Sequence, residues 1–294
     1  DALGIDEGFY SNELNRDFVT NNEFLVTAKK EGLLGSNFNA SVSFGGTQWQ
    51  RTRYGLKGES GEWVSPWLFS FNNYEDELNA PKISEVRYEK QINSVYGFLN
   101  LSYSNFLFLE LAGRNDWSSA LPLNNNSYFY PSGSLSFIAS EALQALPEWW
   151  SFWKIRGAYA QTASDTNPFQ LDFVYNIGSF GGNQTATLPE TIPPIALTPQ
   201  QANSFEIGTT LGFFDDKINL DFTYYSIRSF DQILDSPLPN SSGANKIRIN
   251  TGELKNSGFE AIVNVQVLKT RDFFLETGIN ISRNRNYVVS LGEE

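Results

Sequence analysis

Apolar and polar residues alternate along most of the chain, with the period of two that places successive side chains on opposite faces of a β-strand. Ile218, Leu220 and Phe222, for example, alternate with Asn219 and Asp221. The same alternation recurs in segment after segment, including residues 38–44, 204–213, 259–267 and 275–282. The chain therefore reads as a series of β-strands.

Counting these segments predicts about ten strands. We place them at residues 22–31, 37–46, 85–103, 106–116, 127–140, 151–163, 202–214, 217–229, 246–268 and 272–288. Several are longer than the roughly 9 to 11 residues that a tilted strand needs to cross the hydrocarbon of a membrane. We expect the excess to project beyond the membrane on one side.

The connections between these strands alternate between short and long. The short ones are residues 32–36, 104–105, 215–216, 269–271 and the somewhat longer 141–150, in which we expect a helical turn; the long ones are 47–83, 117–126, 164–201 and 229–245. In an antiparallel meander every second connection lies at the same end of the sheet. Short turns at one end and long loops at the other are typical of outer-membrane barrels, whereas Greek-key sandwiches keep no such order.

Aromatic residues gather near the predicted strand ends. Trp117, Tyr128, Phe129 and Tyr130 lie toward the long connections, and Trp149, Trp150 and Trp153 toward the short ones. Such an arrangement is typical of the two aromatic girdles at the surfaces of a membrane. Aromatics are also good strand residues in general, so packing within the sheet is the alternative interpretation.

Composition removes several classes of function. The net charge of −12 argues against nucleic-acid binding, which needs a basic surface. Cys and His are absent, which excludes disulfides, cysteine or histidine metal sites and Ser-His-Asp triads. No apolar run approaches the 18 residues of a membrane helix. Met is also absent and no leader precedes Asp1, so we expect a processed or partial chain.

Several ordered motifs resemble those of SusC/RagA-type TonB-linked outer-membrane proteins. They are NSVYGF at 93–98, GRNDWSSALP at 113–122, NNNSYFYPS at 124–132, WKIRGAY at 153–159, FEIG at 205–208, YY at 224–225 and INTGELKNSGFE at 249–260. The resemblance covers about residues 85–291, and the first 84 residues fit it as divergent strands and loops.

This resemblance implies a 22-stranded barrel with an internal plug, driven by TonB and covered by a SusD-type surface lipoprotein that captures glycans or peptides. The whole chain, residues 1–294, would be a partial barrel domain. The plug, the TonB box and the N-terminal extension are not recognisable in it, and Gly292, Glu293 and Glu294 end it without a terminal aromatic strand. Since an open sheet in lipid leaves unsatisfied backbone groups at its edges, we expect further strands to complete the wall.

Three groups of carboxylates are candidates for the paired acids of glycoside hydrolysis. They are Asp215 with Asp216, Asp231 with Asp235, and Glu75, Asp76 and Glu77. The first suits a hairpin turn, and the others suit solvated loops, so we expect no enzyme activity. Asn, Asp and Gly in the long loops leave calcium possible, but no ligand set is recognisable and no cofactor is expected.

Two groups of residues are candidates for contact with a transported solute. Aromatic residues that could stack on sugar or contact the lid are Trp49, Trp63, Trp67 and Phe69, in the predicted loop 47–83, and Trp117. For the four in the loop, packing of the rings against their neighbours is an equal alternative. The polar residues that alternate with apolar ones along the strands should line the barrel lumen. They are Glu206, Asn219, Asp221, Asn264 and Asn280.

The sequence thus predicts an all-β, antiparallel transmembrane β-barrel segment of a nutrient importer in a Gram-negative outer membrane. The expected partners are TonB, through the plug, a SusD-type lid, outer-membrane lipid, and an oligosaccharide or peptide. The alternative from another class is a soluble or surface-attached carbohydrate-binding β-sandwich, in which the apolar faces would pack on each other.

Overall fold

A computed structural model describes residues 10–33, 37–61, 64–65, 67–74, 80–143, 146–180, 183–194 and 196–291. Ten long strands form one sheet, in the order β1-β2-β3-β4-β5-β6-β10-β11-β14-β15. Their bounds are β1 Ser11–Lys30, β2 Phe38–Glu59, β3 Lys82–Tyr103, β4 Leu107–Ser118, β5 Ser127–Ile138, β6 Trp150–Ser164, β10 Gln200–Phe213, β11 Ile218–Phe230, β14 Glu253–Lys269 and β15 Phe274–Ser290.

Smaller elements lie in the connections. Two short sheets are formed by β7 Asn176–Phe180 with β8 Asn183–Thr187, and by β9 Thr191–Ile192, β13 Lys246–Asn250 and β12 Ile233–Pro237. The helical elements are α1 Ala139–Ala142 and the 3-10 turn η2 Asn240–Ser242.

The chain divides into two compact units. The first comprises the described residues of 1–22 and 48–92, and the second those of 23–47 and 93–294. Strands β1, β2 and β3 contribute to both. The second unit contains β4 to β15, with α1, and it holds most of the features on which the functional argument depends.

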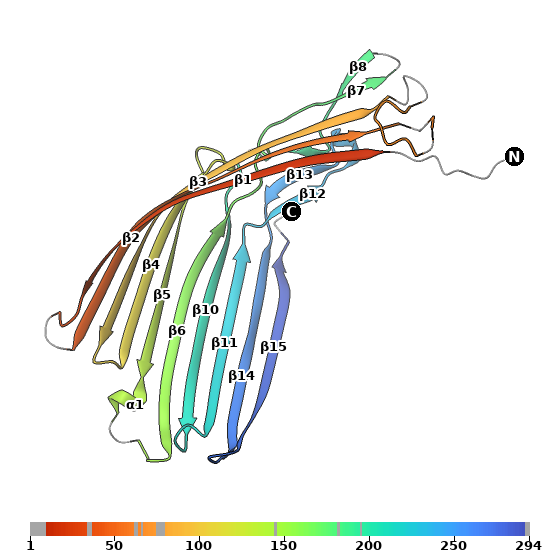
Figure 1. The fold of residues 1–294 in the computed structure, drawn as a ribbon. Coiled ribbons are helices and arrows are strands. Elements are labelled where there is room, and N and C mark those ends of the chain that lie inside the picture. The colour runs from red at the N-terminus through yellow and green to blue at the C-terminus, as the bar shows by residue number, and fades with distance from the viewer. Residues whose placement is uncertain are drawn as a thin grey trace. The chain divides into compact units, whose positions relative to one another are not determined.

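Within the second unit the short connections share one end of the sheet, the lower end in Figure 1, and the connections β4–β5, β6–β10 and β11–β14 share the other. The hairpin at 214–217 is tight: Phe214, Asp215 and Asp216 have φ angles of 56°, 55° and 59°. Asp tolerates this left-handed conformation better than most residues, and the prediction of a turn at Asp215 and Asp216 is confirmed. The predicted rhythm of short and long connections is confirmed for β6–β10, β10–β11, β11–β14 and β14–β15. It fails at one place, because the β4–β5 connection, residues 119–126, is shorter than the β5–β6 connection, residues 139–149.

Some predicted boundaries were wrong. Strands β1 and β2 extend through 11–21 and 47–59, beyond their predicted bounds, where few apolar residues mark a strand. Backbone pairing and polar cross-strand contacts hold these extensions, as where Arg51 binds Asp17 in the first unit. The predicted strand 246–268 is two strands, because Gly252 turns the chain with a φ of +81°. The helical turn begins at 139, two residues before the expected connection.

The register gives the sheet of the second unit two unlike faces, because residues paired across an antiparallel ladder project on the same side. Asp221 pairs with Thr210 and Ile262. We call the face that carries Asp221 the polar face. The opposite face, which we call the apolar face, carries Leu220 paired with Leu211 and Val263.

The aromatic groups at the two strand ends differ from each other. At the short-turn end, Trp149, Trp150, Trp153, Phe213 and Phe214 form one cluster, with neighbouring ring centroids 5.0 to 6.2 Å apart.

At the other end the register separates the four aromatics that we expected together. Trp117 and Phe129 lie on the apolar face, but Tyr128 and Tyr130 pair with Asp116 and Arg114 on the polar face. Tyr128 and Tyr130 therefore do not belong to a girdle on the apolar face, and that expectation was wrong for both. The reason is the strict alternation of a strand, which sends Phe129 and its two neighbours to opposite sides.

The long connections of the second unit pack on one another above the sheet. Leu121, Tyr128 and Leu197 form a buried cluster, against which Tyr130, Ala163, Leu171 and Ile233 are packed. Leu197, in the β6–β10 connection, is fully buried. These loops are therefore ordered parts of the structure with a small core of their own.

Candidate functional site: the polar face of the sheet

Arg156 is the centre of a charged network on the polar face. It rises from β6, and its guanidinium Nη1 and Nη2 donate to the two carboxylate oxygens of Asp221 on β11, at 3.0 and 2.8 Å. The same nitrogens donate to the hydroxyls of Thr210 at 3.1 Å and Thr223 at 2.5 Å, and Thr210 donates to Asp221 at 2.7 Å. Such a fork-shaped, charge-assisted contact fixes the guanidinium in position.

A glycine on the intervening strand makes this contact possible. Gly208 of β10 pairs with Arg156, and a Cβ on it would lie 2.8 Å from the guanidinium carbon. The arginine thus lies directly over the glycine backbone to reach the next strand. Glu206, two residues earlier on β10, lies 3.9 Å from Nε of Arg156 and adds a second, longer ion pair.

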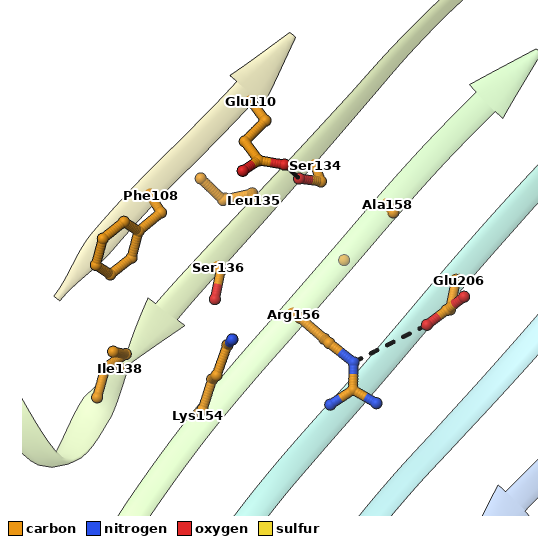
Figure 2. A pocket seen from close by; sticks show the side chains of 11 residues that line it. Phe108, Glu110, Ser134, Leu135, Ser136, Ile138, Lys154, Arg156, Ala158 and Glu206 are labelled. Atoms are coloured by element: carbon orange, nitrogen blue, oxygen red, sulfur yellow. Dashed lines mark hydrogen bonds and ion pairs between the residues drawn. The ribbon is translucent and has the colours of Figure 1, made fainter. Parts of the chain in front are cut away.

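A hollow of about 420 Å³ lies beside this network, over β4, β5, β6 and β10. Figure 2 shows Glu110, Lys154, Arg156 and Glu206 around it. Ser134 donates to Glu110 at 3.3 Å, while the Lys154 ammonium makes no ion pair with any described residue. Two cations and two carboxylates at this hollow, beside the apolar Phe108, Leu135 and Ile138, provide donors and acceptors for a hydrated solute.

A second hollow of about 420 Å³ is lined by residues of β1, β3, β4, β5 and β6, nearer the long connections. Arg114 at its edge donates to Asp116 at 2.7 Å and to Ser94 at 2.8 Å. Its guanidinium also lies over the ring of Tyr96, 5.6 Å from the centroid, and Tyr96 donates to Glu23. Arg114 and Asp116 belong to the RNDW motif, so the polar half of that motif is one hydrogen-bonded network.

Asn250 holds the long connections in place. Its side chain accepts from the backbone N–H of Thr198 and donates to the Thr198 carbonyl, both at 2.8 Å, and it also donates to the carbonyl of Asp231 at 2.9 Å. One asparagine therefore joins the β6–β10 connection to the start of the β11–β14 connection.

The five residues predicted to line a lumen share the polar face. The register pairs Asn219 with Asn264, and pairs Ile262 with both Asp221 and Asn280. Glu206 is on the same face through its pairing with Tyr225. Only Glu206 and Asp221 of the five touch Arg156. That these side chains meet a solute stays a prediction.

The described aromatic candidates belong to different parts of the chain. Trp67 and Phe69 lie in the β2–β3 connection of the first unit and are 81% and 63% exposed. Trp49 is not in a loop as expected, because β2 extends past it, and it is half-buried. Trp117 belongs to the second unit, on the apolar face of β4. Trp63 lies outside the described residues.

The carboxylate groups weighed as catalytic pairs have other environments. Asp235 on β12 binds Arg248 on β13. The Arg248 guanidinium donates to both carboxylate oxygens of Asp235, at 2.7 and 2.9 Å. This hydrogen-bonded guanidinium holds the pKa of the Asp235 carboxyl below its ordinary value. Glu75, Asp76 and Glu77 lie outside the described residues. In the part of the chain that is described, no three His, Cys, Asp or Glu side chains gather as metal ligands would.

Sequence reasoning missed Arg156, Lys154, Arg114 and Asn250 as site residues. All four lie within the motifs that carry the family resemblance. The signal that could have found them is a charged residue, such as Arg156, in the middle of a strand at a position where polar residues alternate with apolar ones. None of the described helices is both long enough and apolar enough to span a membrane.

Comparisons with known proteins agree with this architecture. A family profile described as "TonB dependent receptor-like, beta-barrel" matches residues 3–289. Two relatives from Formosa agariphila, TonB-dependent receptors P3 and P26, are each 27% identical, over 76% and 92% of this chain respectively. Those alignments cover 23% and 28% of the relatives, so the chain spans about a quarter of their length.

Two solved structures share the fold. The structure of the RagAB peptide transporter matches with a TM-score of 0.86 and 17% identity, over 96% of this chain and 31% of that one. The outer-membrane transporter YddB from Escherichia coli matches with a TM-score of 0.62 and 14% identity, over 92% and 34%.

Proposed function

The chain belongs to the β-barrel family of TonB-dependent receptors, and from this premise we propose that it forms wall strands and extracellular loops of an importer for oligosaccharides or peptides. The family places it in the outer membrane of a Gram-negative bacterium, as part of a barrel with short periplasmic turns and long extracellular loops. The apolar face then meets lipid and the polar face lines the lumen.

The family assignment removes the soluble alternative. A carbohydrate-binding sandwich would bury its apolar faces between two packed sheets. Here ten strands form a single sheet, and its edge strands β1 and β15 are exposed along their described length. Exposed apolar residues such as Ile279 and Ile281, 63% and 57% exposed, are what a lipid-facing strand needs.

The observation that carries the proposal is the charged network on the polar face. Arg156 is held by Asp221 and Glu206 at the edge of a hollow. Lys154 also lines this hollow, and its ammonium makes no ion pair with any described residue. A hydrated chain with amide or hydroxyl groups would find donors and acceptors there. The lumen role of Glu206, Asn219, Asp221, Asn264 and Asn280 is part of this proposal.

Family membership also suggests which proteins act together with this chain. We propose that energy comes from TonB through a plug, and that a SusD-type lipoprotein covers the extracellular side. The neighbour RagAB is described as a peptide transporter, which favours peptides among the solutes to be tried first. The exposed Trp67 and Phe69 are candidates for the contact with the lipoprotein or with the solute.

The family is one of transport receptors and not of enzymes, and we propose that this chain catalyses no reaction and needs no cofactor. Calcium binding in the loops is testable by titration in the presence and absence of a chelator.

The experiment is uptake by cells that carry the complete receptor and its neighbouring lipoprotein. Labelled peptide mixtures and oligosaccharides of graded length are offered to wild-type cells, to a receptor deletion, and to cells with Lys154→Gln and Arg156→Gln. The proposal expects uptake of one class to disappear in the deletion and to fall in the variants, at unchanged receptor levels. Wild-type uptake of neither class, or turnover of the solute by purified receptor, would contradict it.

A further inference from the structure

A basic cluster lies on the apolar face of β11, β14 and β15, on the side of the long connections. It consists of Arg228, Lys255, Arg283 and Arg285. The register pairs Arg228 with Lys255, Arg283 with Phe259, and Arg285 with Ser257. Since Phe259 and Ser257 alternate with Lys255 on one face of β14, all four cations project to the lipid side of the wall.

The cluster follows directly on the apolar band. Along β15 the residues of this face are Leu275, Thr277, Ile279 and Ile281, and then Arg283 and Arg285. Strand β15 starts at the short turn 270–273 and runs toward the long connections. The change from isoleucine to arginine therefore occurs where the wall leaves the hydrocarbon on the extracellular side.

Among the described residues, the charge of the cluster is neutralised only in part. Glu253, which binds Arg228, is the one carboxylate that the described parts of β11, β14 and β15 place on this face. Among the described residues, Arg283 and Arg285 make no ion pair, and both are exposed. The whole chain has a net charge of −12. Four cations grouped at one height on the apolar face therefore need a specific explanation.

We infer that this cluster binds the phosphate groups of the phosphorylated glycolipid in the outer leaflet, with the acyl chains lying against the isoleucines below. A guanidinium suits phosphate because it donates two parallel hydrogen bonds to it. Two arginines two residues apart on one strand face lie about 7 Å apart, a spacing that two phosphates or one phosphate and its neighbour can bridge. This inference depends on family membership and orientation, and not on which solute is transported.

The test uses the complete receptor, purified in a neutral detergent and titrated with lipid A. Binding is measured by native mass spectrometry, alongside enzymatically dephosphorylated lipid A and inorganic phosphate. Wild-type receptor should bind lipid A and lose at least about tenfold in affinity when the phosphates are removed, since charge-assisted hydrogen bonds are lost. Arg283→Gln with Arg285→Gln should lose a similar factor. Arg283→Lys with Arg285→Lys keeps the charge but not the paired hydrogen bonds, and should lose less than the glutamine pair.

A matched control removes two positive charges at the opposite end of the same hairpin, with Lys269→Gln and Arg271→Gln. This pair should bind lipid A like the wild type. Equal loss in the control pair, equal binding of the dephosphorylated lipid, or competition by inorganic phosphate at equal concentration would overturn the inference. If the Arg283 and Arg285 pair fails to assemble, Lys255→Gln provides the same test with a single charge, and unchanged affinity there would count against it.

Discussion

The guanidinium of Arg156 binds the carboxylate of Asp221 across an intervening strand, and the backbone of Gly208 lies beneath the contact. Three strands are thereby joined on the polar face by side chains as well as by their backbone ladders. The glycine of the FEIG motif thus has a physical explanation. Any larger side chain at position 208 would occupy the space that the Arg156 side chain fills.

This arrangement predicts a coupling between Gly208 and Arg156. Gly208→Ala should lower the free energy of unfolding by about 1 kcal/mol, because the new methyl group displaces the guanidinium from its hydrogen bonds. In an Arg156→Ala background the same substitution should cost close to nothing, since nothing remains to be displaced. Chemical denaturation of the complete receptor in detergent measures both. The control is Gly157→Ala, where the nearest atom to a new Cβ is 3.9 Å away.

The two faces of β14 should respond in opposite ways to a charge. Val263→Arg, on the apolar face between Leu220 and Ile279, should cost about 2 to 4 kcal/mol if it lies near the middle of the bilayer. Asn264→Arg, one residue further on and on the polar face, should be tolerated. The measurement is the fraction of receptor that assembles in the outer membrane. Equal loss for both variants would show that the polar face does not meet water.

Asn250 is predicted to order two loops at once. Asn250→Ala removes hydrogen bonds to Thr198 and Asp231, each worth about 1 kcal/mol. Limited proteolysis of intact cells should then cut within 165–199 several times faster than in the wild type. Asn284→Ala, at an exposed position of β15, should leave cleavage unchanged; faster cleavage there too would mean that the loops respond to general destabilisation.

The ion pair of Asp235 with Arg248 should give the β12–β13 ladder a dependence on pH. The pKa of Asp235 is lowered in the folded state, so its stabilisation is present above the ordinary value of about 3.9 and is lost as the pH falls through the lowered pKa. The pair is partly exposed, and we expect about 0.5 to 1 kcal/mol from it.

Amide hydrogen exchange at Ile249, which pairs with Leu234, reports on that ladder once it is corrected for the intrinsic rate. Asp235→Asn should exchange faster at pH 7, and the difference from the wild type should shrink at pH 3. Asp272→Asn, in the short turn between β14 and β15, should change nothing at Ile249. A difference that is constant over this pH range would contradict the assignment.

The sequence predicted the barrel strands well where one face is apolar. Strands such as β10 and β11 appear within two residues of their predicted ends, because alternation is imposed by lipid on one side and water on the other. The extensions of β1 and β2 lie where polar residues occupy both faces, and there the pattern has no signal.

The site was harder to predict than the fold. Alternation identified the polar face, and with it Glu206 and Asp221. It could not show that Arg156 reaches over Gly208, or that Asn250 joins two connections, because these contacts depend on the register between strands that are far apart in sequence. Tyr128 and Tyr130 were misplaced because adjacent aromatics in one strand face opposite sides.

The central claim is that one face of this sheet lines an aqueous lumen while the other meets lipid. The most direct measurement is site-directed spin labelling at single cysteines in the complete receptor, reconstituted in bilayers. The account predicts that labels at Asn219, Asn264 and Asn280 collide with a water-soluble paramagnetic reagent, and that labels at Leu220, Val263 and Ile279 collide with oxygen dissolved in the lipid. The same accessibility at both sets of positions, or the reverse order, would contradict it.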